Sequence, residues 1–113
     1  MSKSLQEITS LLTQFRDARD WAQFHDSKNL ALALSIEAAE LNELFLWKKE
    51  SESDEVNKEK LKEELADVFA YALLLADKHD LDVIQIVKDK VAKNAAKYPV
   101  DKAKGTAKKY NEL

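Results

Sequence analysis

Two short acidic motifs interrupt otherwise apolar stretches of the sequence. Glu37 and Glu40 are three residues apart in SIEAAELNEL, and Glu64 and Asp67 have the same spacing in EELADVF. Because residues three apart lie on one side of a helix, each pair would present two carboxylates together. Leucines and other apolar residues flank Glu37 and Glu64 at helical spacing, so both acids face a core. Buried acids repel one another unless cations lie between them, and the sequence therefore predicts a metal site.

The donor set indicates which metal this site would hold. Carboxylate oxygens without His or Cys favour Mg²⁺, or Mn²⁺, over zinc or copper. A di-iron bundle would need Glu-x-x-His pairs, whereas the two histidines, His25 and His79, lie outside both motifs. A structural alternative stays open, in which some of these acids are solvated or pair with Lys60, Lys62 or an arginine.

Hydrophobic periodicity and capping residues predict four helices. A possible capping box, Ser4 to Glu7, starts the first helix, Asp26 or Ser27 caps the second, and Asp82 caps the fourth, which Pro99 ends. The polar stretch 48–57 is the best candidate for a long loop. The predicted helices cover about 4–22, 28–47, 58–78 and 83–97.

Composition supports an all-α fold. The 113 residues suit one domain, and a single Gly and a single Pro leave little to interrupt long helices. Four helices with short connections predict an antiparallel four-helix bundle over residues 1–100, followed by a polar tail at 101–113. The second and third helices are apolar over more than one stripe, so we expect a homo-oligomer, either a dimer or a tetramer built as a dimer of dimers.

Charge and cysteine content narrow the function classes. The net charge of −3 argues mildly against binding to a nucleic-acid backbone. From Leu81 onward eight lysines face four acids, a balance of +4, so residues 1–80 carry −7. An acidic part for metal and a basic part for phosphate would suit a metal–polyphosphate substrate, although the lysines could simply solvate the last helix and tail. Without cysteine, signal peptide or membrane span, we expect a cytoplasmic protein.

Other kinds of catalytic site have little support in the sequence. There is no glycine-rich phosphate loop and no local signature of a Ser-His-Asp triad. Both histidines flank turns between helices, where a surface or capping role is the ordinary one. Trp21, Trp47 and Tyr71 could belong either to the core or to a ligand pocket.

Four segments in this order and spacing resemble the MazG-like all-α nucleoside triphosphate pyrophosphohydrolases, and especially their dCTP pyrophosphatase group. The segments are RDARDWAQFHDSKNL (16–30), EAAELNELFLW (37–47), EELADVFAY (63–71) and KVAKNAAKYP (90–99). The resemblance covers nearly everything from Leu5 to Val100. It implies a four-helix unit in dimers or tetramers, with Mg²⁺ held by Glu37, Glu40, Glu64 and Asp67.

The same resemblance implies roles for further residues. Trp21 and Trp47 match aromatic positions of a base pocket, and Tyr71 follows the acidic motif as it does in the family, where it is a further candidate for substrate binding. His25 and Asn29 match a turn motif that either touches substrate or only shapes the turn. A motif similar to a phosphate clamp matches Lys90, Asn94, Lys97 and Tyr98. The broader family often has a further acid before Glu37, where this chain has Ile36. The metal count and preferred nucleotide of MazG proper therefore should not be copied here.

The implied activity is hydrolysis of a (deoxy)nucleoside triphosphate, dCTP or a base-modified dCTP, to the monophosphate and pyrophosphate, as a house-cleaning reaction. Glu37 or Glu40 would take the proton of the attacking water, while Lys90 and Lys97 would stabilise the leaving pyrophosphate. Two alternatives remain open. One is a broad activity on dATP or dUTP, and the other is a non-enzymatic helical module that binds another protein.

Overall fold

The computed structural model describes residues 3–113, and every regular element within that range is a helix. The predicted all-α class is confirmed. The chain divides into two compact units, one up to Leu81 and one from Asp82 onward, and each is described by itself. The first unit contains α1 (Lys3–Ala18), η1 (Ala22–Phe24), α2 (Ser27–Glu43), η2 (Glu50–Glu52) and α3 (Lys58–Lys78), and the second contains α4 (Val83–Lys97), α5 (Val100–Ala103) and η3 (Tyr110–Glu112).

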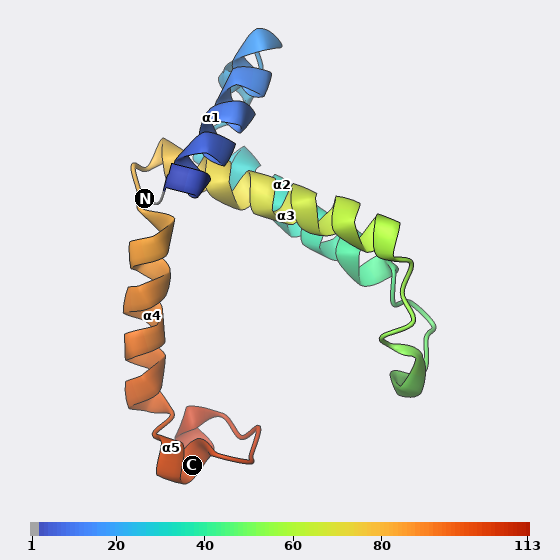
Figure 1. Cartoon of the computed structure of the whole chain (residues 1–113), viewed down its shortest axis with the longest axis vertical. Helices are drawn as coiled ribbons and strands as arrows, with labels where there is room; N and C mark the ends of the chain where they lie inside the picture. Colours follow the sequence, from blue (N-terminus) through green and yellow to red (C-terminus); the bar gives the residue numbers. More distant parts are fainter. Residues whose placement is uncertain (1–2) are drawn as a thin grey trace. The chain divides into compact units, whose positions relative to one another are not determined.

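In the first unit, α2 and α3 run side by side in opposite directions, and α1 crosses them near the start of α2 (Figure 1). A hydrogen bond of 2.8 Å between Ser27 Oγ and His79 Nε2 joins the start of α2 to the end of α3. The buried residues gather at this end of the helix pair. They come from all three helices: Thr9, Leu30, Leu73, Leu74 and Ala76.

Side-chain caps explain why three helices begin where the sequence predicts. The Asp26 carboxylate accepts a hydrogen bond from the Asn29 N–H at 2.7 Å, and Asp82 accepts one from the Gln85 N–H at 3.2 Å. Asn57 Oδ1 accepts hydrogen bonds from the N–H groups of Glu59 and Lys60 at the start of α3, both at 3.1 Å. Each cap satisfies backbone donors that have no partner inside the helix. The predicted bounds of α3 and α4 are confirmed at both ends.

The predicted bounds of the first helix are wrong. α1 already includes Lys3, so Ser4 lies inside its first turn and not before it, as a capping box would require. α1 also ends at Ala18, because Asp20 adopts a left-handed conformation (φ 55°) and the Trp21 N–H donates back to the Arg16 carbonyl at 3.1 Å. This helix-ending motif usually carries Gly, although Asp tolerates positive φ better than most residues. The stop therefore lacked its usual sequence signal.

The predicted end of the second helix is wrong too. α2 ends at Glu43, and the N–H groups of Leu44, Phe45 and Leu46 each donate to the carbonyl three residues earlier. This tighter winding ends at Trp47, whose φ of 66° cannot continue a right-handed helix. Neither Gly nor Pro marks the place, so the apolar pattern through Trp47 overstated the helix length.

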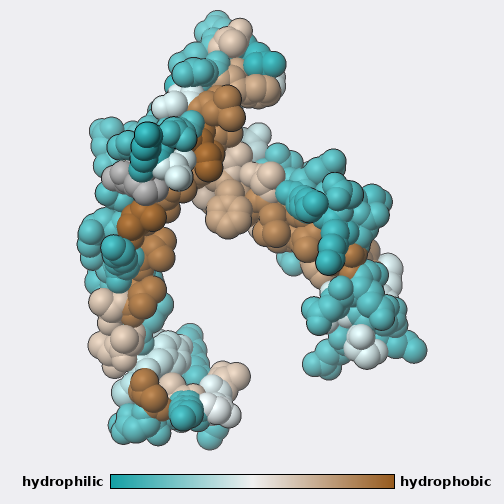
Figure 2. Space-filling model, viewed as in Figure 1, coloured by the Kyte–Doolittle hydropathy of each residue, from teal (hydrophilic) through white to brown (hydrophobic). Residues whose placement is uncertain are grey.

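The second unit is built around α4. Apolar side chains gather on one side of this helix, with polar ones on the other (Figure 2), and Ile86, Val87 and Val91 are all exposed. After α5 the chain brings Tyr110 edge-to-face against Tyr98, with ring centroids 6.1 Å apart. No helix within residues 3–113 has the length and apolar character needed to cross a membrane.

Candidate metal and nucleotide site

Three of the four predicted metal-binding acids converge between α2 and α3. Glu37 and Glu40 come from α2 and Glu64 comes from α3, and one carboxylate oxygen of each lies within 4.8 Å of the others. The three-residue spacing places the α2 pair on one face, and the packing of α2 against α3 brings Glu64 to it. Two segments far apart in the sequence thus form one acidic cluster.

The cluster has the chemistry that a hard divalent cation requires. Within the described residues, Glu37 Oε2 and Glu64 Oε2 are shielded from solvent and have no hydrogen-bond partner. Oxygen ligands of Mg²⁺ lie about 2.1 Å from the ion, so opposite ligands are about 4.2 Å apart. Oxygens within 4.8 Å of one another need only small side-chain movements to share one ion. The residues therefore fit Mg²⁺, and Mn²⁺ by the same argument.

The electrostatics of the cluster also favour a bound positive charge. Burial raises the pKa of Glu37 to about 7, and the neighbouring Glu40 adds to this rise through a shared hydrogen bond and through charge repulsion. The pKa of Glu64 is raised by burial as well, and next by the charge of Glu40. In both cases burial and the neighbouring carboxylates disfavour the charged form. Either a proton or a metal ion would relieve the repulsion.

Asp67, the fourth predicted acid, lies beside this cluster rather than within it. It follows Glu64 by three residues on α3, and its charge contributes to the raised pKa of both Glu37 and Glu64. Asp67 is exposed and lines a neighbouring cavity. It therefore connects the acidic cluster to that cavity, and its role as a fourth metal ligand stays a prediction.

The neighbouring cavity has a volume of about 270 Å³ and is walled mostly by aromatic and apolar side chains. Three of the predicted substrate-binding residues meet here, namely Trp21, His25 and Tyr71. The His25 and Tyr71 rings lie edge-to-face with centroids 6.4 Å apart, and Phe15 and Trp21 make a similar contact at 5.8 Å. The full lining is Leu12, Phe15, Arg16, Trp21, His25, Asp67, Ala70, Tyr71 and Leu74.

His25 and Tyr71 present neutral polar groups near this cavity at pH 7. Burial lowers the pKa of His25, and the positive charge of Arg16 lowers it further. Burial raises the pKa of Tyr71, and the charges of Glu37 and Asp67 add to that rise. Among the described residues His25 Nδ1 is buried and has no hydrogen-bond partner. A polar ligand in the cavity could supply one.

The structure places Asn29 and Trp47 away from the lining of this cavity. The Asn29 side chain donates to the Phe24 carbonyl at 3.1 Å and to Asp26 Oδ2 at 3.3 Å, so it holds the turn before α2. Trp47 lies beyond the end of α2 and is 92% exposed. A contact of either side chain with substrate stays a prediction.

The predicted phosphate-clamp residues all belong to the second unit. Lys90, Asn94 and Lys97 lie on α4, and Tyr98 follows its end. The Lys97 ammonium lies 4.9 Å from the centroid of the Tyr110 ring, a favourable cation–π contact. These residues belong to the second unit, and their role in binding phosphate stays a prediction.

Sequence reasoning did not assign five of the residues that line the cavity to the site: Leu12, Phe15, Arg16, Ala70 and Leu74. Leu12, Phe15 and Arg16 follow the i, i+3, i+4 pattern of one helix face, so helical spacing could have placed the arginine beside its apolar neighbours. The sequence analysis gave Arg16 no role of its own. Only the crossing of α1 over α3 shows that this face borders a cavity.

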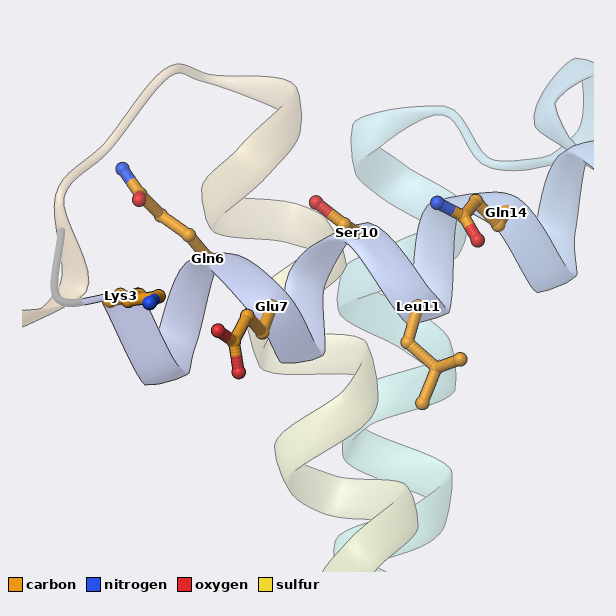
Figure 3. A pocket seen from close by; sticks show the side chains of 6 residues that line it. All are labelled: Lys3, Gln6, Glu7, Ser10, Leu11 and Gln14. Atoms are coloured by element: carbon orange, nitrogen blue, oxygen red, sulfur yellow. The ribbon is translucent and has the colours of Figure 1, made fainter.

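Two further hollows lie on α1 or between α1 and α3. One, of about 370 Å³, runs along α1 alone (Figure 3) and is lined by Lys3, Gln6, Glu7, Ser10, Leu11 and Gln14. The other, of about 530 Å³, is an apolar hollow between α1 and α3, lined by Leu5, Ile8, Leu12, Ala66, Asp67, Phe69, Ala70 and Leu73. Neither combines aromatic walls with several polar groups as the cavity beside the cluster does.

Comparison with known proteins tests the resemblance to the MazG-like family that the sequence showed. Residues 32–113 match the MazG-like family model. The chain is 40% identical to mouse dCTP pyrophosphatase 1 and 38% identical to the human protein, in each case over 97% of this chain and 68% of the relative. The crystal structure of a pyrophosphatase from Archaeoglobus fulgidus is similar, with a TM-score of 0.82 and 42% identity over 88% of this chain and 95% of that one. The resemblance seen in the sequence is confirmed, and the chain belongs to the MazG-like family.

Proposed function

We propose that this protein hydrolyses a deoxynucleoside triphosphate, dCTP or a base-modified dCTP, to the monophosphate and pyrophosphate in a Mg²⁺-dependent reaction. The predicted enzyme class, a nucleoside triphosphate pyrophosphohydrolase, is confirmed by the similarity to curated dCTP pyrophosphatases and to the archaeal pyrophosphatase. The observation that carries the proposal is the acidic cluster of Glu37, Glu40 and Glu64 beside an aromatic cavity.

The acidic cluster would hold the metal and the triphosphate end of the substrate. Glu37, Glu40 and Glu64 would bind Mg²⁺, with Asp67 as a further ligand. A bound Mg²⁺ neutralises charge that develops on the phosphates and lowers the pKa of a nearby water. Glu37 or Glu40 would accept the proton of the attacking water as the bridge between the α- and β-phosphates breaks.

The aromatic cavity would hold the base. Its volume of about 270 Å³ falls near the lower end of small-molecule pockets, which are roughly 300–1,000 Å³, and so suits a base rather than a whole nucleotide. Trp21 and Tyr71 offer ring faces for stacking, and His25 offers a polar nitrogen. Trp47 and Asn29 remain candidate contacts, and Lys90, Asn94, Lys97 and Tyr98 would bind the leaving pyrophosphate.

The apolar surface of the helices supports an assembled form. Leu32 and Ile36 on α2 and Phe69 on α3 are each more than half exposed. Exposed apolar area of this extent is unusual for a monomer. We therefore propose a four-helix bundle fold in a homo-oligomer, a dimer or a tetramer, which a measurement of mass in solution would test.

The decisive experiment measures pyrophosphate release from canonical and base-modified nucleoside triphosphates, with Mg²⁺ and with EDTA. Metal-dependent release that is strongest for dCTP or a modified dCTP supports the proposal. Comparable release from dATP or dUTP would favour the broad-specificity alternative. No release from any triphosphate would contradict the proposed activity and favour a helical interaction module.

A further inference from the structure

Arg16 occupies an unusual position for a charged residue. It lies near the end of α1 and lines the aromatic cavity together with Trp21, His25 and Tyr71. Its side chain is only 22% exposed. A guanidinium is rarely held in such a place unless its N–H groups have partners there.

The guanidinium of Arg16 is only partly satisfied by the protein. Its Nε donates to Asp17 Oδ1 at 2.8 Å. Within residues 3–113, neither terminal nitrogen of Arg16 has a hydrogen-bond partner. These two nitrogens carry four of the five donors in a fixed planar fork. The protein therefore holds the guanidinium through Nε, and the outer donors have no partner among the protein groups of residues 3–113.

The charges around Arg16 favour a neutral ligand over a phosphate. Asp17 is bonded directly to the guanidinium, Asp77 interacts with it electrostatically, and Asp67 lines the same cavity. These carboxylates offset the positive charge and would repel a polyphosphate. A neutral ring that offers hydrogen-bond acceptors fits the cavity better than an anion does.

Cytosine presents such acceptors in the right arrangement. Its O2 and N3 are neighbouring acceptors on one edge of the ring, so two parallel N–H groups can donate to both. In uracil and thymine, N3 carries a hydrogen and is a donor. This N3–H would point at an N–H group of the guanidinium, which is unfavourable because neither group can accept. A site built for one pattern discriminates strongly against a base that leaves its groups unpaired.

On the basis of the proposed function, we propose that Arg16 is a specificity-determining residue that donates a two-point hydrogen bond to O2 and N3 of a cytosine base held in the cavity. Arg16 thereby selects cytosine nucleotides over uracil and thymine nucleotides. The contact leaves C5 of the ring unread, so base-modified cytosines that differ at C5 remain substrates.

The first test uses the wild-type protein and three substrates, dCTP, its 3-deaza analogue and dUTP. The 3-deaza analogue replaces the N3 acceptor with C–H and keeps O2. We expect kcat/KM to fall roughly 10- to 100-fold for the analogue and for dUTP, as for loss of a good two-point contact to a base. Equal kcat/KM for dCTP and the analogue would overturn the proposal. Failure of the wild type to cleave any of the three would instead overturn the proposed function.

The second test compares Arg16→Gln and Arg16→Lys with the matched control Arg19→Gln. Arg19 is the only other arginine; it stacks on the Phe15 ring, with Cζ 3.6 Å from the centroid, and does not line the cavity. In both Arg16 variants the ratio of kcat/KM for dCTP to that for the 3-deaza analogue should fall towards one, mainly through KM for dCTP. Lysine keeps the positive charge but lacks the planar pair of donors. A low ratio in Arg16→Lys would therefore show that the shape of the guanidinium, and not its charge alone, distinguishes the two substrates.

The Arg19 variant should keep the wild-type ratio. Because the ratio is taken within each variant, partial loss of folded protein affects both substrates alike, and residual turnover is enough to measure it. Arg16 variants that retain the wild-type ratio would show that another residue reads N3, and the proposal would fail while the proposed function stands.

Discussion

Glu37 on α2 and Glu64 on α3 each hold a carboxylate oxygen, Oε2, shielded from solvent and without a hydrogen-bond partner in the described structure. One oxygen from each lies within 4.8 Å of the other. Two carboxylates in this arrangement repel each other when both are charged, and the pKa of each is raised. The relationship is unfavourable for the metal-free protein and favourable for a protein that binds a divalent cation.

Glu64→Gln should abolish pyrophosphate release, with at least a 100-fold loss of kcat, because a neutral amide is a poor ligand for Mg²⁺. The metal-free variant should melt at the same temperature as the wild type or higher, since repulsion with Glu40 is relieved. Thermal melts and turnover assays test both parts. Glu63→Gln, at the adjacent position, is the matched control and should retain activity. Wild-type kcat in Glu64→Gln would remove this residue from the site.

Mg²⁺ should raise the melting temperature more at pH 8 than at pH 6. With a pKa of about 7, Glu37 is largely protonated at pH 6, and a proton competes with the metal for its carboxylate. A ligand that binds only the folded state stabilises it in proportion to its affinity. Melts with millimolar Mg²⁺ at the two pH values provide the measurement. An equal shift at both would argue against Glu37 as a ligand.

Without metal, the protein should lose stability as pH rises from about 4.5 to above 7. The pKa of Glu37 is raised from 4.5 to about 7, so across this window the folded state binds more protons than the unfolded state does. Stability that depends on the Glu37 proton is fully present below the lower pKa and is lost as pH passes the upper one. Denaturant unfolding in EDTA measures the slope. Glu37→Gln should flatten it, and an unchanged slope would assign the effect to other groups.

Trp21→Ala should raise KM for the preferred nucleotide about 10-fold or more with a smaller effect on kcat. Stacking between a base and an aromatic ring contributes roughly 1–3 kcal/mol, and Trp21 lines the cavity proposed for the base. Trp21→Phe keeps a ring face and should recover much of the affinity. Steady-state kinetics on both variants separates stacking from packing, since a packing role alone would affect melting temperature without this pattern in KM.

Trp47→Gly should leave the melting temperature unchanged or raise it, whereas Trp47→Val should lower it. Trp47 has a φ of 66° and is 92% exposed, so it is held in a conformation that Gly accepts freely while little burial is lost. The β-branched side chain of Val makes the same conformation less favourable. If activity falls in Trp47→Gly while stability does not, Trp47 contacts substrate as predicted. Lower stability in the Gly variant would mean that Trp47 is buried in the assembled protein.

Much of the helical layout follows from local sequence. α3 and α4 begin and end where the pattern predicts, because Asn57 and Asp82 are strong N-cap residues and each helix carries a regular apolar period. The ends of α1 and α2 were placed too late because apolar residues continue the pattern beyond them, to Ala22 and Trp47. A non-glycine residue with positive φ follows each of these helices, as Asp80 does after α3, but only after α3 does a polar turn mark the stop in the sequence.

For the site, the sequence alone determined which acids share a helix face, because a three-residue spacing has the same consequence in any α-helix. The tertiary structure decided which of them meet. Packing of α2 against α3 brings Glu64 to Glu37 and Glu40 and leaves Asp67 lining the cavity next to them. The crossing of α1 over α3 likewise places Arg16 at the wall of this cavity. Distances between helices depend on how their side chains pack, which no local spacing contains.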